Sequence, residues 1–387
     1  MSNHGSRHKR DRKTSSSYMN VELFEEAGKD RIEAKAPTKD DPALRRFIPN
    51  PAGDPDARLS RLGILDWRKN PLDDRLADIE EVADRIICAD AEQALKSLPD
   101  ESVNCIITSP PYWNVIDYGF QGQLGFCDYD EYLMQLLRVW RECERVLCPN
   151  GKLCIEAPVM PISKKVLANQ HTRHLKNINN DIEAVILKHL DLERFSLYIW
   201  QKQTTEKMFG SYPYPPNLYE QNTIEFINVF VKKGKPRRIE KEIKEESRVT
   251  EKEWMDLTRQ VWPLYPEDVK RATHPAPFPE SVPNRLITMY TFAKFEADDK
   301  RFPGDIVLDP FNGTGATCAA AKRMKRRFIG IDLSPQFCIS AQQRLDKCLP
   351  DKKIFLIKNK NKENKSQSVK TGPGFDSTQG KVKSSNL

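Results

Sequence analysis

A short apolar run that ends at two consecutive prolines is the strongest constraint on how this chain folds. Residues 103–108 hold an apolar run of the kind found in a strand inside a parallel sheet. Pro110 and Pro111 end the run, because a proline has no N–H for a neighbouring strand and pushes the residue before it toward an extended backbone. The sequence therefore predicts a buried strand that stops at a stiff corner, where open α/β sheets keep their ligand crevices.

The side chains at this corner suit a flat ligand that carries an amino group. The Ser109 hydroxyl and the Pro110 carbonyl are acceptors held in fixed positions, and Tyr112 and Trp113 offer flat faces beside them. Two acceptors and an aromatic face match a planar heterocycle with an NH₂ group, which donates two hydrogen bonds. An ordinary strand-to-loop turn explains the same residues equally well at this point, since serine and proline are common in turns.

Strand-like and helix-like segments alternate along most of the chain. This rhythm predicts an α/β fold with a doubly wound, mostly parallel sheet. The segments 195–201 and 224–232 differ, because their pattern favours an antiparallel pair at a sheet edge. The predicted strands are 84–90, 103–108, 152–157, 195–201, 224–232, 306–308 and 327–332, and the predicted helices lie within 58–82 and at 91–98, 130–147, 282–295, 316–325 and 334–345.

The two ends of the chain differ in composition from the rest. Of the 387 residues, 1–57 and 351–387 are poor in apolar side chains and are expected to be disordered basic or polar tails around one main domain at 58–350. The formal net charge of +7 favours a polyanionic partner over an acidic small molecule.

Cysteine usage and hydropathy predict a soluble, intracellular (cytoplasmic) protein without a membrane partner. The nine cysteines are odd in number and include no CxxC pair, which argues for buried thiols in a reducing compartment rather than disulfides or structural zinc. His171 and His174 form an HxxH pair without matching ligands, so no metal site is expected. No run of about 18 apolar residues and no signal-peptide core is present.

A second cluster combines a strand, an acidic residue and a glycine turn. Asp309 follows a predicted strand, and Gly313 and Gly315 lead into an alanine-rich helix, where a ligand can approach backbone amides closely. A further strand ends at Asp332, 17 residues after Gly315, about where nucleoside-binding folds place the carboxylate that binds ribose hydroxyls. Plain packing of a strand against a helix is the alternative interpretation.

The acidic residues favour a ligand with a nucleoside at one end and a cationic group near the other. Asp332 would bind the ribose, and Asp309 would face the cation. S-adenosyl-L-methionine fits this description better than a dinucleotide, because position 318 is Cys and the full GxGxxG fingerprint is absent. Asp90, at the end of an earlier strand, either contacts the same cofactor or only caps the helix that follows.

Together these stretches resemble the amino-group DNA methyltransferases, which act on cytosine N4 or adenine N6. Residues 108–113 match the (S/D)PPY catalytic motif of that family, and residues 309–315 match its cofactor motif. The segments 274–279 and 330–335 are also similar to family motifs. The resemblance covers about residues 84–348, and the catalytic motif precedes the cofactor motif, as in the permuted β-group.

The resemblance implies a Rossmann-like, S-adenosylmethionine-dependent methyltransferase domain with target-recognition insertions within about 160–270. Its catalytic residues would be Ser109, Pro110, Pro111 and Tyr112. A flipped-out base would stack on Tyr112, and the methyl group would move by direct in-line displacement. The implied cofactor-binding residues are Asp90, Thr108, His274, Asp309, Pro310, Phe311, Gly313, Gly315 and Asp332.

The target base is where the resemblance leaves alternatives open. Serine at position 109 favours cytosine N4, and adenine N6 is the alternative because both targets occur with this motif. A catalytically idle nucleic-acid-binding protein on the same scaffold is a further alternative. Methylation of RNA or of a protein glutamine is disfavoured, because those relatives usually carry Asn before the two prolines. The expected partner is double-stranded DNA, and the resemblance allows a cognate restriction endonuclease.

Overall fold

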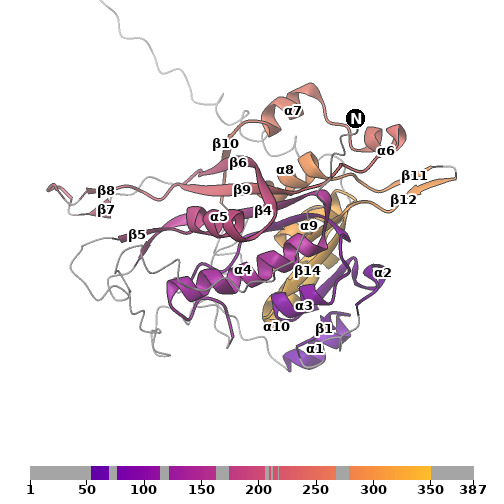
Figure 1. Cartoon of the computed structure of the whole chain (residues 1–387), viewed down its shortest axis with the longest axis horizontal. Coiled ribbons are helices and arrows are strands. Elements are labelled where there is room, and N and C mark those ends of the chain that lie inside the picture. The colour runs from indigo at the N-terminus through magenta and orange to yellow at the C-terminus, as the bar shows by residue number, and fades with distance from the viewer. Residues whose placement is uncertain are drawn as a thin grey trace, which may run out of the picture.

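A single large sheet carries the fold of the computed structural model (Figure 1). The structure describes residues 54–68, 76–113, 122–162, 174–204, 209–210, 212–216, 218–266, 279–297 and 299–349. Within these residues the sheet has ten strands. Nine lie in the order β1 (Leu65–Asp66), β2 (Arg85–Cys88), β14 (Arg327–Asp332), β13 (Ile306–Asp309), β3 (Val103–Thr108), β4 (Leu147–Ile162), β9 (Ile224–Lys232), β6 (Leu192–Lys202) and β10 (Val261–Leu264), and β5 (His174–Asn177) pairs with β4.

Strand direction divides the sheet into two halves. From β1 to β4 all neighbours are parallel, which confirms the predicted α/β architecture. β9 is antiparallel to both β4 and β6, so β6 runs in the same direction as β3 and β4. The predicted edge position of this pair is wrong, because β10 covers the outer side of β6. The short β10 sequence, which includes Pro263, gave no strand signal.

Helices cover both faces of the sheet. On one face, α3 (Ala91–Lys96), α4 (Tyr129–Val146) and α5 (Ile178–His189) pack in one apolar cluster. On the other face, α1 (Pro55–Arg61), α8 (Ser281–Tyr290), α9 (Ala316–Arg323) and α10 (Pro335–Asp346) form a second cluster. The sheet is therefore doubly wound, as the alternating pattern predicts.

The caps explain where the main helices begin. Asp128 accepts a hydrogen bond of 2.8 Å from the Glu131 amide at the start of α4. The apolar stripe of α4 buries Trp140 completely, in line with its predicted amphipathic pattern. Ser334 caps α10 and Pro335 opens it, both as predicted.

Smaller elements lie around this core. They are α2 (Ile79–Val82), α6 (Lys241–Glu246), α7 (Glu251–Leu257) and the two-stranded pairs β7 (Phe209–Gly210) with β8 (Leu218–Tyr219) and β11 (Phe295–Ala297) with β12 (Lys300–Phe302). Several predicted boundaries differ from those of the structure, for example at two helices. The chain is ordered as α1 from Pro55, inside the predicted tail, and the helix predicted at 282–295 ends at Tyr290. In the described part of the chain, none of the helices has the length and apolar character needed to cross a membrane.

The connections place a crevice at one seam of the sheet. From β3 the chain continues to β4 on one side, whereas from β13 it continues to β14 on the other side. β13 and β3 are parallel neighbours, with Val307 opposite Cys105 and Leu308 opposite Ile106. The strand order thus reverses between β13 and β3, and ligands of open α/β sheets bind at the carboxyl ends of the strands at such a point.

Candidate active site

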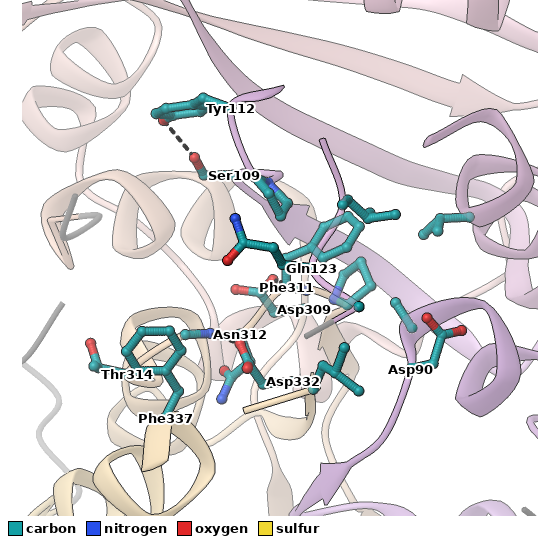
Figure 2. A pocket seen from close by; sticks show the side chains of 18 of the residues that line it. Asp90, Ser109, Tyr112, Gln123, Asp309, Phe311, Asn312, Thr314, Asp332 and Phe337 are labelled. Atoms are coloured by element: carbon teal, nitrogen blue, oxygen red, sulfur yellow. Dashed lines mark hydrogen bonds between the residues drawn. The ribbon is translucent and has the colours of Figure 1, made fainter. Parts of the chain in front are cut away.

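An open cavity, with a volume of about 960 Å³ when the solvent at its mouth is included, lies where β13, β3 and β14 end (Figure 2). Ser109 and Gly313 both line it, so the proline corner and the glycine turn meet in one cavity, as the sequence predicts. The other predicted residues that line it are Asp90, Pro111, Tyr112, Asp309, Pro310, Phe311 and Asp332.

Asp309 joins the two motifs across the seam. Its side chain is 4% exposed and accepts hydrogen bonds from Thr108 Oγ1 at 2.7 Å and from the Phe311 amide at 3.1 Å. Burial raises the pKa of Asp309 to about 6, although these hydrogen bonds oppose the shift. Thr108 is fully buried and does not line the cavity. Thr108 therefore supports Asp309 from behind and does not reach the cavity.

Asp332 lies at the end of the neighbouring strand and is held by backbone amides. Gly313 N donates to one carboxylate oxygen and Ser334 N to the other, each at 2.8 Å. Burial raises the pKa of Asp332 to about 7, and the nearby charge of Asp309 adds to the shift. Within the described residues neither carboxylate forms a salt bridge, so the cavity contains two acidic groups without a cation of the protein beside them.

Gly313 and Gly315 have different structural roles. Gly313 has φ +50°, lines the cavity and presents its amide to Asp332. Gly315 caps α9 with φ +80° and does not line the cavity. A Cβ added there would lie 2.9 Å from the Cβ of Ala341 on α10. The structure therefore gives Gly315, which was predicted as a cofactor residue, a role in the packing of α9 against α10.

Both interpretations of Asp90 apply at once. Its Oδ1 accepts a hydrogen bond of 3.0 Å from the Gln93 amide and so caps α3. Asp90 also lines the cavity, on the side of β2 (Figure 2). The cap holds the carboxylate in a fixed position at the rim of the cavity.

Sequence reasoning missed several residues of the cavity wall. Phe337, which is 3% exposed, comes from the first turn of α10, and Gln123 comes from the glycine loop before α4. Asn312 packs over Gly330, where a Cβ would lie 2.7 Å from Asn312 Cγ. The position of Phe337 just after a helix cap at a strand end was a usable signal, whereas Gln123 carried none. His274 lies outside the described residues.

Trp113 does not belong to the ligand face that the sequence suggested. Its side chain is 1% exposed, its Nε1 donates to the Cys127 carbonyl at 2.9 Å, and its ring meets Tyr129 edge to face. The corner is anchored instead by Tyr132 of α4, whose hydroxyl donates to the Pro111 carbonyl at 2.7 Å. Pro110 is buried and is not part of the cavity wall, although Ser109 and Pro111 on either side of it are.

A chain of hydrogen bonds fixes which way the Ser109 hydroxyl points. Tyr112 is 8% exposed and its hydroxyl donates to Glu156 Oε2 at 2.9 Å. The Ser109 and Tyr112 hydroxyl oxygens are 2.7 Å apart (Figure 2). Because the one proton of Tyr112 is used on Glu156, the Ser109 hydroxyl is the donor to Tyr112. The lone pairs of Ser109 Oγ are then left as acceptors.

Glu156 at the end of this chain is half of a buried acid pair. It is 2% exposed, and burial followed by the neighbouring Glu225 raises its pKa well above the ordinary value. Lys202 forms an ion pair with Glu225, which is 7% exposed. Glu156 Oε1 has no donor within the described residues, as expected for two adjacent carboxyl groups until one of them carries a proton. Burial and the neighbouring acid therefore favour the protonated form of Glu156, while Lys202 pairs with Glu225.

The cavity therefore has what S-adenosyl-L-methionine requires. Asp332 can accept from ribose hydroxyls, Asp309 provides negative charge for a cationic group, and Phe311 and Phe337 offer apolar faces for a base. Buried acids that the described residues leave without a cation fit a positively charged ligand. Fold and site together define a Rossmann-like, S-adenosylmethionine-dependent methyltransferase.

Comparison with known proteins gives the family. A family model described as DNA methylase, of the N6/N4 type, matches residues 103–343. The type II methyltransferase M.MjaI of Methanocaldococcus jannaschii is 30% identical over 288 residues, which cover 64% of this chain and 86% of the relative. M.SmaI of Serratia marcescens is 27% identical, with 67% of this chain and 90% of the relative covered. This chain belongs to the DNA methylase family.

A solved structure agrees with this assignment. A protein of Thermus thermophilus, whose structure is described as that of a DNA modification methylase complexed with S-adenosyl-L-methionine, is 31% identical to this chain. The superposition covers 69% of this chain and 94% of the Thermus chain, with a TM-score of 0.55. The sequence comparison and the structure comparison thus agree on the fold and the family.

Proposed function

We propose that this protein transfers a methyl group from S-adenosyl-L-methionine to the exocyclic N4 amine of cytosine in double-stranded DNA, as the modification enzyme of a restriction–modification system. The observation that carries the proposal is the hydrogen-bond chain from Ser109 through Tyr112 to Glu156, since a Ser109 hydroxyl that donates into this chain keeps its oxygen as an acceptor beside the cavity. The target amine donates to Ser109 Oγ, which lines the cavity. The Pro110 carbonyl, which the sequence suggests as a second acceptor, belongs to a residue that does not line the cavity.

The protein contributes position and electrostatics rather than a covalent intermediate. Tyr112 provides a ring on which a flipped-out base stacks, and the acceptors orient its amine. When bound, S-adenosyl-L-methionine supplies an electrophilic methyl group on a sulfonium. One N–C bond forms while the S–C bond breaks, and the amine gives up one proton to solvent. A neutral Glu156 holds the acceptor geometry and is not required as a base.

The residues of the cofactor side have matching proposed roles. Asp332 accepts from the ribose hydroxyls, with the Gly313 amide fixing its carboxylate. Asp309, supported by Thr108, faces the cationic end. Pro310 and Phe311 complete the wall, and Asp90 is placed at the rim. Target recognition is assigned to segments within about 160–270, and a cognate endonuclease is the proposed partner in the cell.

The test identifies the modified nucleoside. Purified protein is incubated with methyl-deuterated S-adenosyl-L-methionine and DNA from a strain without amino-group methylation, and the DNA is digested to nucleosides for mass spectrometry. Deuterated N4-methylcytosine is the expected product. Deuterated N6-methyladenine would keep the chemistry and replace the target base, because the same acceptors also hold an adenine amine. The absence of any label in DNA would leave the idle nucleic-acid-binding protein as the better interpretation.

A further inference from the structure

A projecting hairpin exposes two tyrosines that the described part of the protein leaves uncovered. β7 and β8 pair through Phe209 with Tyr219 and Gly210 with Leu218. Beyond the pair, Tyr212 and Tyr214 are 68% and 73% exposed, and Leu218 is 63% exposed. Large aromatic side chains at this exposure lose apolar contact with no gain for the fold, so a cluster of them marks a contact surface. We call residues 212–216 the tyrosine tip.

The tyrosine tip lies on the side of the sheet where the active-site cavity opens. β6 runs parallel to β3 and β4, so its carboxyl end lies at the same edge as Thr108 and Asp309. The tip belongs to the connection from that end of β6 to the start of β9. In Figure 1, β7 and β8 extend from this edge well beyond β6 and β9, at the left of the view.

The chemistry of the tip is aromatic and stiff rather than charged. Pro213, Pro215 and Pro216 restrict φ around the two tyrosines, so little conformational freedom is lost when the rings bind. No charged residue occurs in 212–216. Flat, uncharged rings at the same sheet edge as the cavity suit the sugars and base edges of a groove, whereas they lack the lysines and arginines that bind phosphates.

We propose that the tyrosine tip contacts the base pairs next to the target nucleotide and holds duplex DNA at the mouth of the active site through Tyr212 and Tyr214. This inference rests on the proposed function, because the ligand is the DNA substrate of the same site. If the exposed rings bound a protein partner instead, replacing them would leave the affinity for DNA unchanged. The DNA contact is therefore the version that a binding experiment tests directly.

The experiment compares full-length protein with the double variant Tyr212→Ser/Tyr214→Ser. A fluorescently labelled duplex of mixed sequence, with S-adenosyl-homocysteine present, is titrated by anisotropy at several salt concentrations. Since burial of the rings dominates the proposed contact, the Kd for duplex should rise about 10- to 100-fold. The slope of log Kd against log salt should stay the same, because no phosphate contact is removed. The double variant Tyr212→Phe/Tyr214→Phe should bind like the wild type.

Two controls separate the possible failures. Trp254→Ala removes an equally exposed aromatic side chain (64%) from α7, which lies away from β7 and β8 in Figure 1, and should leave the Kd unchanged. Cofactor binding by calorimetry should be the same in all variants. An unchanged duplex Kd in the serine variant, or an equal loss in Trp254→Ala, would overturn the inference. A wild-type protein that transfers no label to DNA would instead overturn the proposed function.

Discussion

The two halves of the sheet bury acidic residues in different ways. In the parallel half, Asp309 and Asp332 are held by amides and a hydroxyl from nearby strand ends, and no cation from the described residues lies beside them. In the antiparallel half, Glu156 and Glu225 come from β4 and β9, and Lys202 neutralises the pair. The first arrangement is completed by a ligand and the second is complete in itself. We infer that the parallel half binds the cofactor and that the antiparallel half shapes the acceptor for the substrate.

The largest effect on activity is expected from a substitution of Tyr112, which links Ser109 to the buried acid pair. Tyr112→Ala deletes both the stacking ring and the link between Ser109 and Glu156. The loss of stacking and of orientation should lower kcat/KM for DNA by about 100- to 1,000-fold. Single-turnover methyl transfer measures the loss.

The matched control for this change is Tyr112→Phe. It keeps the ring and loses only the hydroxyl, so about tenfold of the activity should be lost, as expected for one hydrogen bond. Equal losses in the two variants would show that the hydroxyl, and not the ring, carries the effect. Cofactor affinity should stay constant in both, because Tyr112 is assigned to the substrate side.

The second prediction tests whether Gly315 of the cofactor motif binds the cofactor or allows α9 to pack against α10. Gly315→Ala puts a Cβ 2.9 Å from Ala341 Cβ at a residue with φ +80°. Backbone strain and overpacking together should lower the free energy of unfolding by about 2 to 4 kcal/mol. Chemical denaturation measures this change, while calorimetry at low temperature should find nearly wild-type affinity for cofactor.

Gly63→Ala is the comparison for Gly315→Ala. Gly63 has φ +69° with no atom within 4 Å of an added Cβ, so only the strain remains, about 1 kcal/mol. If the two variants lost the same stability, the contact with α10 would be irrelevant. If Gly315→Ala lost cofactor affinity while it stayed folded, the packing role would be wrong.

The same contrast explains what the sequence could and could not predict. Asp309, Gly313 and Asp332 line the cavity from short stretches that each join a strand end to the next helix, so residue order alone indicated that they meet. Glu156 and Glu225 are brought together by the register of β4 and β9, in which Pro158 is opposite Glu225, and no local pattern reports a register.

The details that were predicted wrongly also depend on contacts between segments that are separated in the chain. The predicted aromatic face of Trp113 is wrong because α4 and its preceding loop cover the ring, a contact made 14 residues away. The edge position of the β6–β9 pair is wrong because β10, a run of four residues that pairs with β6, could not be recognised as a strand. Most strand and helix segments were predicted well, since each depends on residues close together in the chain.

The third prediction concerns how the affinity for cofactor depends on pH through the carboxylates that line the cavity. Cofactor binding requires ionised carboxylates, and the pKa of Asp332 is raised to about 7. The affinity for S-adenosyl-L-methionine should therefore rise about tenfold between pH 6 and pH 8. Without cofactor the sign is opposite for stability: the folded state holds the extra proton, so stability falls as pH rises from about 4 through about 7.

Calorimetric titrations across this pH range test the linkage. Asp332→Asn should bind cofactor more weakly at pH 8 and should lose most of the pH dependence, since Asn does not titrate. A pH slope that persists in Asp332→Asn would assign the titration to another group, for which Asp309, with a pKa of about 6, is the candidate. A wild-type affinity that did not change with pH would contradict the description of the parallel half as a site completed by a cation.

The smallest change in activity is expected for Glu156→Gln, and this variant tests most directly what Glu156 does in the antiparallel half. If Glu156 is neutral and its proton faces Glu225, glutamine reproduces it, with the amide oxygen accepting from Tyr112 and the amide nitrogen donating to Glu225. Glu156→Gln should then keep kcat within about threefold of wild type, whereas Glu156→Leu, which ends the hydrogen-bond chain, should lose about tenfold.

Stability gives a second readout. The raised pKa of Glu156 makes the wild type lose stability as pH rises above about 4.5, and this slope should be flatter in Glu156→Gln. If Glu156→Gln were as inactive as Glu156→Leu and showed a shifted pH–rate profile, Glu156 would act as a proton acceptor during methyl transfer, and the antiparallel half would take part in the chemistry itself.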